Sequence, residues 1–567
     1  MFSLGIDLGT SNTVAAVTVL SEGQYKTVMI PLSGGRTGIS LRSSVSFDRS
    51  DIMYTGVEAE KMKKQYPDGN ASGFKVRMGT EYLYSANGNF HSPVELSAII
   101  LERVKTEAEK YMNSKLRDAV IAVPAYFNHN QRNATREAAT IAGIRVKQLV
   151  SEPTAAAISY WNRVRTKEAK NILVFDMGSG TTDVSVVRAQ GRYFKVLGTY
   201  GNTRLGGSDM DRQIEDKMKL FLRRLSVIPY PAGLRSEAEK LKIKLSRHES
   251  AEVLLGPEKI KYTMSSRQLN EIVERMLPDI YKCIDTAISN SGISRSRINI
   301  LILTGGSARI PFLFHSIEDY LSIRAVKNID PETAVAIGSS ILASGFINGD
   351  NGEISRIKLN DVVPMSLGSV VLNDIAVTMI PANTPIPCSN TRPFTTIRDY
   401  QKEIEVKVVQ GERPMGSDNI QIGIFRLSGI KPAPRGEVSI NVTYSVDKNG
   451  ILTVTARDED TGSSREITID NSMQHNPEEI QEMKDKVKRY FKADSERKKM
   501  AEIMNRSEQL LHDLKGIANR QLSSETVYYN INVDILRVSK AIKSNNIRLL
   551  SQLTEKLELE YGLKNSL

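Results

Sequence analysis

The chain has 567 residues, of which 40% are hydrophobic and 25% charged, and its 76 basic and 65 acidic side chains give a formal net charge of +11. This length predicts about three to five domains, each able to bury its own core. The basic residues are interleaved with acidic ones, which argues against nucleic-acid binding. Cys283 and Cys388 lie far apart and outside any metal-ligand spacing, which argues against a disulfide framework or a zinc site.

The first twenty residues do not have the composition of a targeting segment. Asp7 interrupts their apolar stretch, so a signal peptide is not predicted. No uninterrupted apolar run of the chain reaches transmembrane length. We therefore expect a cytoplasmic protein without a membrane partner.

Residues 1 to about 350 alternate short apolar runs with longer helical patterns. The strand-like runs are 119–123, 172–175 and 298–303, and the helical patterns are 93–111, 130–142, 207–225 and 265–289. This alternation predicts an α/β region in which helices cover a mixed sheet in each of two lobes. A segment rich in Gly, Asn and Asp at 345–356 indicates the end of this region.

Two segments of the α/β region share one pattern about 170 residues apart. Leu4–Thr13 and Leu173–Asp183 each contain an apolar run ending in Asp, a Gly-rich turn with hydroxyl groups, and the start of a return strand. Glycine lets backbone N–H groups approach an anion, and an Asp at a strand end suits a hydrated cation. Either copy alone is also compatible with a plain hairpin turn. Together they predict two similar lobes that enclose a phosphate and a divalent metal.

A third Gly-rich turn, Leu303–Pro311, follows a predicted strand and opens a helix. The pair Gly305 and Gly306 would let a ligand lie on the backbone. Arg309 is placed to stack its guanidinium on a purine, although an ordinary surface arginine is the alternative.

The pattern of apolar and polar residues changes twice in the rest of the chain. From about Val362 to Asp470, short alternating runs separated by turn signals predict an antiparallel β-sandwich. After Pro477 the pattern returns to helix, with acidic residues near its start, where the helix macrodipole favours them. We expect a helical tail of two to four helices.

These motifs, and their order along the chain, resemble those of the DnaK family of heat-shock chaperones. The resemblance covers residue 3 to about 490 and rests on the three turns and on 119–128, 151–157, 205–211, 409–413 and 432–436. It implies a multidomain chain with an actin-like (ribonuclease H-like) two-lobed α/β ATPase at 1–352, an interdomain linker at 353–361, a peptide-binding β-sandwich at 362–475 and a helical lid at 476–567. The implied function is that of a stress-response chaperone whose affinity for unfolded polypeptides is switched by ATP.

The family's catalytic positions match six residues, and the implied reaction is hydrolysis of ATP to ADP and phosphate. They are Lys75, Glu152, Asp183, Thr181, Asp7 and Asp176. By resemblance, Asp7 and Asp176 hold waters around Mg²⁺, with K⁺ as a further candidate cation. Lys75 orients the attacking water, although a lone lysine is otherwise a solvated surface cation. Glu152 and Asp183 poise water and metal, and Thr181 lies beside the γ-phosphate.

The family's ATP-binding positions lie in the three turns and on one predicted helix. They are Gly9, Thr10, Ser11, Asn12, Gly178, Ser179, Gly180, Thr181, Thr182, Gly206, Gly207, Glu239, Lys242, Ser246, Gly305, Gly306, Ser307 and Arg309. Glu239, Lys242 and Ser246 are three and four residues apart, so they share a helix face. An exposed, ion-paired helix is the alternative.

The family's peptide groove matches apolar positions of the predicted sandwich. They are Leu372, Phe394, Ile397, Ile404 and Val406. Extended apolar peptides would bind there through main-chain hydrogen bonds and a side-chain pocket. Ordinary sandwich core is the alternative. A J-domain co-chaperone and a nucleotide exchange factor are candidate partners by resemblance.

Several features depart from the best-known members of the family. The linker has polar residues at alternate positions of 357–361, which predicts weakened or differently wired coupling. Gln148 replaces an arginine used for J-domain docking. Ser179 replaces a glycine, which requires that its φ is not strongly positive. About 45 residues separate Lys75 from Val120, and together with the short tail this resembles the HscC-like branch.

Other proteins with a two-lobed ATPase fold leave two alternatives open. Sugar and acetate kinases would need a second substrate pocket with a catalytic base, and an actin-like filament protein would assemble with ATP. Neither gives a role to the predicted sandwich and helical tail, but a fold alone does not determine function.

Overall fold

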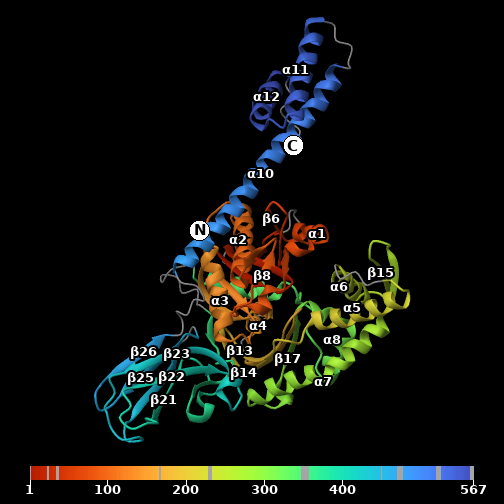
Figure 1. Cartoon of the computed structure of the whole chain (residues 1–567). Helices are drawn as coiled ribbons and strands as arrows, with labels where there is room; N and C mark the ends of the chain where they lie inside the picture. The colour runs from red at the N-terminus through yellow and green to blue at the C-terminus, as the bar shows by residue number, and fades with distance from the viewer. Residues whose placement is uncertain are drawn as a thin grey trace. The chain divides into compact units, whose positions relative to one another are not determined.

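The computed structural model describes residues 2–21, 24–32, 38–164, 166, 168–227, 233–346, 357–447, 450–468, 477–518, 525–561 and 563. These residues form two compact units, Met1–Lys484 and Asp485–Leu567. Both α/β sheets and the β-sandwich belong to the first unit (Figure 1).

The first α/β sheet has the strand order β11-β10-β1-β2-β3, with β4 paired to β2. Its strands are β1 (Phe2–Leu8), β2 (Asn12–Ser21), β3 (Gln24–Met29), β4 (Ser40–Arg42), β10 (Leu116–Val123) and β11 (Arg145–Ser151). β1 and β2 form an antiparallel hairpin, and β10 runs parallel to β1. Helices α2 (Pro93–Met112) and α3 (His129–Ile141) pack together beside this sheet.

The second α/β sheet repeats this arrangement. Its strand order is β17-β12-β13-β14-β18, with β12 (Lys170–Met177), β13 (Thr182–Gln190), β14 (Tyr193–Asn202), β17 (Ile300–Thr304) and β18 (Lys358–Asn360). Here β12 and β13 form the antiparallel hairpin, and β17 runs parallel to β12. Asp7 and Asp176 are each the next-to-last residue of the first hairpin strand. The sequence duplication therefore corresponds to a structural one.

Two helices connect the sheets. α4 (Glu152–Val164) packs against β12 and β13, α9 (Ala334–Ser344) packs against β1 and β2, and the two helices cross each other. Their crossing is close because position 338 is glycine: a Cβ there would lie 1.8 Å from the carbonyl oxygen of Ala155. This contact brings the ends of the two hairpins near one cavity.

Smaller elements complete the α/β region. Beside the first sheet lie β5 (Ser44–Phe47), β6 (Met53–Thr55), α1 (Val57–Gln65), β7 (Asn70–Ser72), the short 3₁₀ helix η2 (Phe74–Arg77), β8 (Tyr84–Ala86) and β9 (Asn89–His91). With the second sheet lie α5 (Gly207–Arg224), α6 (Leu234–Leu245), β15 (Ser250–Leu255), β16 (Ile260–Ser265), α7 (Ser266–Asn290) and α8 (Pro311–Leu321) (Figure 1). The helices predicted from 93, 130, 207 and 265 are all present.

The predicted sandwich consists of two antiparallel four-stranded sheets with orders β20-β19-β22-β23 and β21-β24-β25-β26. Its strands are β19 (Leu367–Val370), β20 (Ala376–Ile380), β21 (Cys388–Phe394), β22 (Glu403–Gln410), β23 (Ile420–Ser428), β24 (Ile440–Val446), β25 (Leu452–Asp458) and β26 (Ser464–Thr468). β24 and β25 alternate buried and less buried residues, because successive side chains of a strand point to opposite faces.

The linker contributes a strand to the second α/β sheet. β18 pairs in parallel with β14, so that Leu359 lies opposite Phe194. Ile357 and Leu359 pack against the core, whereas Lys358 between them is exposed. Polar residues at alternate positions are therefore compatible with a docked linker, since only every second side chain of an edge strand faces the core. Residues 353–356 of the predicted linker lie outside the described residues.

The C-terminal part contains α10 (Pro477–Ala518), α11 (Glu525–Lys543) and α12 (Ile547–Glu560). In the second unit, Leu510 and Leu514 of α10 pack with Val538 of α11 and Leu557 of α12. The described helices fall within the predicted range of two to four. None of them is long and apolar enough to cross a membrane.

Candidate nucleotide and peptide sites

A cavity of about 710 Å³ lies where the three Gly-rich turns meet. Fourteen predicted ATP-binding residues line it, namely Gly9, Thr10, Ser11, Asn12, Gly178, Ser179, Thr181, Glu239, Lys242, Ser246, Gly305, Gly306, Ser307 and Arg309. Asp7, Lys75, Glu152 and Asp176 line it as well. Gly180, Thr182, Gly206, Gly207 and Asp183 are not among the lining residues. The cavity thus brings together residues that are spread over more than 300 positions of the sequence.

A buried ion pair lies at the inner end of the cavity. Nζ of Lys75, in η2, is 2.5 Å from Oε1 of Glu152, the first residue of α4. Burial lowers the pKa of Lys75, but Glu152 and then Asp7 outweigh it, so the net pKa is raised and the ammonium stays charged. Lys75 is therefore not the solvated surface cation of the alternative interpretation.

Three aspartates surround this pair and repel one another. Burial, followed by the charge of Glu152, raises the pKa of Asp7 and of Asp176. The same causes raise the pKa of Asp183 to about 8, although the backbone N–H of Tyr126 donates to its Oδ1 at 3.0 Å. One lysine does not neutralise four carboxyl groups in a buried site. The cluster is therefore suited to a bound cation.

A hydrated Mg²⁺ fits this donor set. Mg²⁺ keeps several waters and takes only one or two protein carboxylates, and Asp7 and Asp176 lie at the ends of the two matching strands. Among the described residues, no group of three or more His, Cys, Asp or Glu side chains is arranged to hold a metal ion directly. Binding through water, as predicted, does not need such a group.

The second and third turns are pressed against each other. Gly305 has φ 82°, and a Cβ there would lie 2.3 Å from the carbonyl oxygen of Met177. Ser307 Oγ donates to the carbonyl oxygen of Gly178 at 2.9 Å. The φ of Ser179 is not positive, which meets the condition for a serine in place of glycine at this position. Its carbonyl accepts from the N–H of Ser208 at the start of α5.

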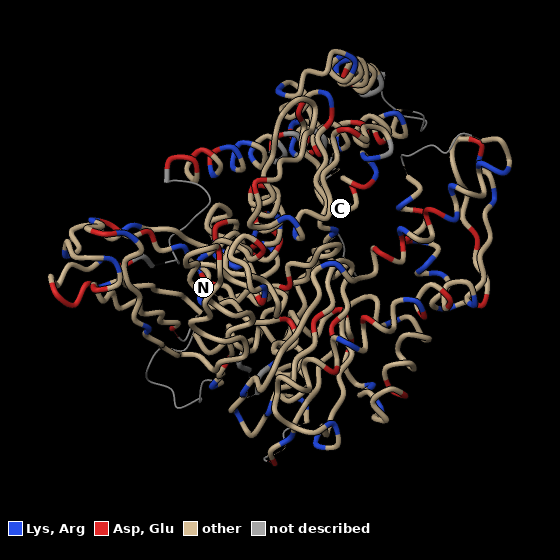
Figure 2. Tube along the Cα trace, turned by 60° about the horizontal axis from the view of Figure 1, so that its bottom comes forward, with Lys and Arg blue, Asp and Glu red and all other residues tan. Residues whose placement is uncertain are grey.

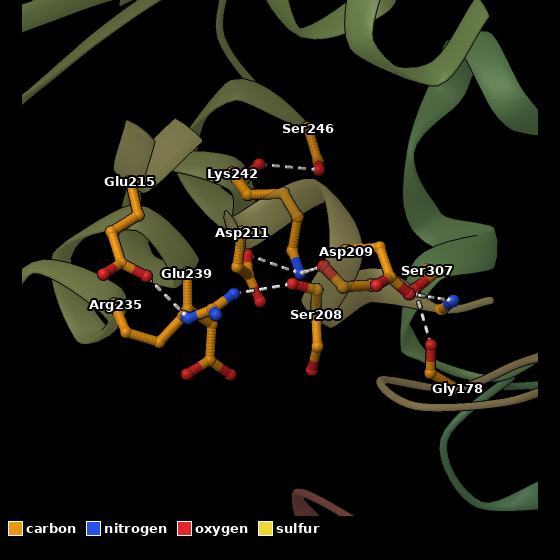
Figure 3. Close-up of polar contacts among 12 residues, drawn as sticks. Gly178, Ser208, Asp209, Asp211, Glu215, Arg235, Glu239, Lys242, Ser246 and Ser307 are labelled. Carbon is orange, nitrogen blue, oxygen red and sulfur yellow. Dashed lines mark hydrogen bonds and ion pairs between the residues drawn. The ribbon is translucent and has the colours of Figure 1, made fainter. Parts of the chain in front are cut away.

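The predicted helix face on α6 is partly buried. Lys242 Nζ donates to the carbonyl oxygen of Gly207 at 2.9 Å and lies 2.8 Å from Asp211 Oδ1. Figure 3 shows the Lys242 side chain directed toward Asp211. Ser246 follows α6 as its C-cap, and its Oγ donates to the Lys242 carbonyl. The face is thus not simply an exposed, ion-paired surface. Lys242 ties α6 to the start of α5 and fixes one wall of the cavity.

Arg309 lies at the rim of the cavity. Its guanidinium pairs with Asp330 at 2.7 Å and with Glu332 at 3.2 Å, and 40% of its side chain is exposed. These two carboxylates hold the guanidinium plane in one orientation, as stacking on a purine would require. The ion pairs with Asp330 and Glu332 are equally compatible with an ordinary surface arginine.

Arg42 forms an ion pair with Glu239 of the cavity lining, a contact that the sequence did not indicate. Its Nη1 lies 2.9 Å from Oε1 of Glu239. This ion pair joins β4 of the first sheet to α6 beside the second. The two residues are 197 positions apart, and no local pattern predicts their contact. Asp211, the partner of Lys242, lies in the motif 205–211, which indicates this residue but not its contact with Lys242.

The predicted peptide positions differ in exposure. Leu372 is 49% and Ile397 44% exposed, whereas Phe394 and Ile404 are half-buried against the sandwich core. Val406 is 6% exposed and lies within that core. For Val406 the structure agrees with the alternative of sandwich core, while Leu372 and Ile397 are available to a ligand.

Comparison with known proteins identifies the family. The model of the family "Hsp70 protein" matches residues 83–562. The chain is 38% identical over 573 residues to the protein named "Chaperone protein DnaK" of Thermoplasma acidophilum, covering 98% of this chain and 92% of the relative. The chain belongs to the Hsp70 family. The DnaK of Methanothermobacter thermautotrophicus is 37% identical (90% of this chain, 87% of the relative), and that of Mycoplasmopsis pulmonis is 38% identical (90% and 86%).

The Hsp70 match extends beyond the ATPase region. It includes the β-sandwich and most of the helical tail, and the Thermoplasma relative also aligns with the N-terminal residues that the family model leaves out. Membership of the DnaK family, which was predicted from the motifs, is thus confirmed.

Proposed function

We propose that this Hsp70-family chain is an ATP-dependent chaperone, which hydrolyses ATP to ADP and phosphate and binds extended apolar segments of unfolded polypeptides. The observation that carries the proposal is the buried Lys75–Glu152 pair beneath the two matching aspartates, at the end of a cavity lined by the three turns. The α/β region would have the actin-like, ribonuclease H-like arrangement, with domains at 1–352, 362–475 and 476–567 around a linker at 353–361.

The catalytic roles follow from position and charge. The Gly-rich turns would hold the phosphates through backbone N–H groups. Lys75 would stabilise charge on the terminal phosphate and orient the attacking water, while Glu152 holds the lysine in place and accepts a hydrogen bond from that water. Thr181 would donate to the γ-phosphate. Such catalysis consists mainly of positioning and electrostatic stabilisation.

Asp7 and Asp176 would hold Mg²⁺ through water, and Asp183 would orient that water. The bound ion would supply positive charge against the phosphates. It would also lower the pKa of the neighbouring carboxyl groups, so that all of them are ionised in the loaded site. A K⁺ ion is a second candidate, for which the described side chains offer no separate site.

Coupling between the two sites would run through the linker. β18 adds a strand to the second α/β sheet, and the N–H of His129 in α3 donates to Oε1 of Gln410 at the end of β22 at 2.8 Å. A change in the nucleotide cavity would therefore be transmitted to the sandwich through the pairing of β18 and this hydrogen bond to the Gln410 side chain. Reciprocity requires that bound peptide also alters nucleotide affinity.

One experiment tests the chaperone assignment directly. The dissociation rate of a fluorescein-labelled extended apolar peptide is measured with and without ATP and Mg²⁺. A rate that increases with ATP supports the proposal, and an unchanged rate reduces the protein to an uncoupled ATPase. Transfer of labelled phosphate to a sugar or to acetate instead of water would favour a kinase, and pelleting with ATP would favour a filament protein.

The partners are proposed from the family alone. A J-domain protein and an exchange factor are the candidates, and Gln148 would alter the docking of the former. In the structure Gln148 lines a small pocket shared by the linker residue Asp361 and the sandwich residue Gln410. Compared with the arginine of the best-known family members, Gln148 leaves this pocket with one positive charge fewer. Such a difference would be consistent with membership of a specialised branch such as the HscC-like one.

A further inference from the structure

A loop of the sandwich, Val371–Ile375, carries two exposed apolar side chains on an unusual backbone. It joins β19 to β20, and Leu372 and Ile375 are 49% and 48% exposed. Between them, Asn373 and Asp374 have φ of 60° and 62°. Two consecutive non-glycine residues in the left-handed region are rarely populated unless their surroundings hold them there.

Asp374 is held by a segment that is distant in the sequence. The backbone N–H of Ser417 donates to its Oδ1 at 3.2 Å and to its Oδ2 at 3.1 Å, and the Ser417 hydroxyl donates to Oδ2 at 2.5 Å. These hydrogen bonds lower the pKa of Asp374, so the carboxylate is ionised at neutral pH. Charge-assisted hydrogen bonds of this kind are stronger than neutral ones.

The segment that holds Asp374 is itself fixed. Asn419 donates from Nδ2 to the carbonyl oxygens of Arg413 and Met415, each at 2.7 Å, and accepts from the N–H of Arg413 at 2.9 Å. A Cβ at position 416 would lie 2.6 Å from a methyl group of Val370 and 2.8 Å from Asp374 Oδ1, so the backbone packs directly on the loop. The loop is thus fastened to a rigid turn rather than left free.

We propose that Asp374 and Ser417 are positioning residues that hold the Val371–Ile375 loop as a fixed wall of the peptide groove, and so set how long a bound apolar peptide stays. This inference rests on the proposed function, because Leu372 is one of the proposed groove residues. Leu372 is two residues from Asp374, so a loop that leaves its left-handed conformation carries the Leu372 side chain away from the ligand. The hydrogen bonds from Ser417 to Asp374 contribute to keeping Leu372 in place.

The test measures dissociation of a fluorescein-labelled nine-residue peptide with a central Leu-Leu-Leu from the full chain in ADP. Ser417→Ala removes one hydrogen bond and should speed dissociation about fivefold, and Asp374→Ala removes all three and should speed it tenfold or more. Ser417→Thr keeps the hydroxyl and should stay within about twofold of wild type. Amide hydrogen exchange at 372–376 should accelerate in the first two variants only.

The matched control is Ser389→Ala, which removes a similar exposed hydrogen bond, from Ser389 to Ser445 at 2.8 Å on the other sheet, and should leave dissociation unchanged. Circular dichroism identifies a variant that does not fold, in which case Ser417→Ala and Ser417→Thr carry the test. If wild type binds the peptide and both Asp374→Ala and Ser417→Ala release it at the wild-type rate, the inference is wrong. A wild-type chain that binds no peptide would overturn the proposed function itself, and the inference with it.

Discussion

Lys75 and Glu152 form a 2.5 Å ion pair that is buried at the inner end of the nucleotide cavity, and the two residues come from different elements 77 positions apart. Asp7, Asp176 and Asp183 lie near the pair, so the lysine is placed within a cluster of carboxyl groups. This arrangement underlies the proposed role of Lys75 at the terminal phosphate.

Replacing this lysine should separate binding from hydrolysis. Lys75→Ala should reduce the rate of ATP hydrolysis by about 100-fold or more, because both water orientation and charge stabilisation are lost. Nucleotide affinity, measured by calorimetry, should change only a few-fold, since the three turns remain. Lys240→Ala is the control, because Lys240 is exposed and pairs with Glu237 outside the catalytic centre. If Lys75→Ala hydrolyses ATP at the wild-type rate, Lys75 does not have the proposed catalytic role.

The contact between Arg42 and Glu239 should slow the release of nucleotide. Each side chain is about 30% exposed, so their ion pair contributes only about 1 kcal/mol. Arg42→Ala should therefore speed dissociation of a fluorescent ADP analogue about fivefold, measured by stopped flow. Arg103→Ala breaks a comparable ion pair with Glu107 within α2, away from the cavity, and should have no effect. Equal release rates in both variants and wild type would contradict the assignment.

The alternation in the linker leads to a position-specific prediction. Leu359→Asp places a charge against the core beside Phe194 and should abolish the acceleration of peptide release by ATP. Lys358→Asp changes an exposed side chain of the same strand and should leave most of that acceleration intact. Peptide dissociation with and without ATP measures both variants. An equal loss at the two positions would show that β18 does not act as a docked strand.

His129 should make the protein sensitive to mild acid. Burial, then Arg132 and Arg136, lowers its pKa to about 4, whereas a histidine in the unfolded chain has a pKa of about 6.5. The unfolded state therefore binds a proton first, so stability is highest above pH 6.5 and falls as the pH decreases toward 4. The loss is about 3 kcal/mol at most.

The measurement for His129 is the difference in Tm between pH 7.5 and pH 5. His129→Gln should show a smaller difference than wild type, and substitution of the exposed His248 by Gln should not change it. A difference of wild-type size in His129→Gln would mean that other groups cause the acid sensitivity.

Features that depend on neighbouring residues could be predicted from the sequence. The two hairpins, the third turn and the sandwich follow from apolar runs, glycines and alternation, and the elements appear close to the predicted positions. The roles of side chains that meet across the fold could not be predicted in the same way. The α6 face is one example, because burial of Lys242 depends on the start of α5. Arg42 is another, because its partner Glu239 lies on α6, which packs with the other α/β sheet.

Composition also left questions that the structure answers. In Figure 2 blue and red residues occur near one another in many parts of the trace, in agreement with the interleaved charges of the sequence. The linker is a different case, because its polar residues at alternate positions suggested weakened or differently wired coupling. In the structure this segment contains a paired edge strand, and its apolar residues Ile357 and Leu359 pack against the core, so the alternation is compatible with docking.

The position of β18 at the margin of its sheet has a consequence for solubility. While it is paired, β18 covers the backbone N–H and C=O groups of β14 around Tyr193–Lys195. If β18 left β14, those groups would lose their partners and the sheet would present an open margin that another extended chain could join. Lys195 on β14 and Lys358 on β18 place positive charge on the two surfaces so exposed, which opposes self-association of undocked molecules.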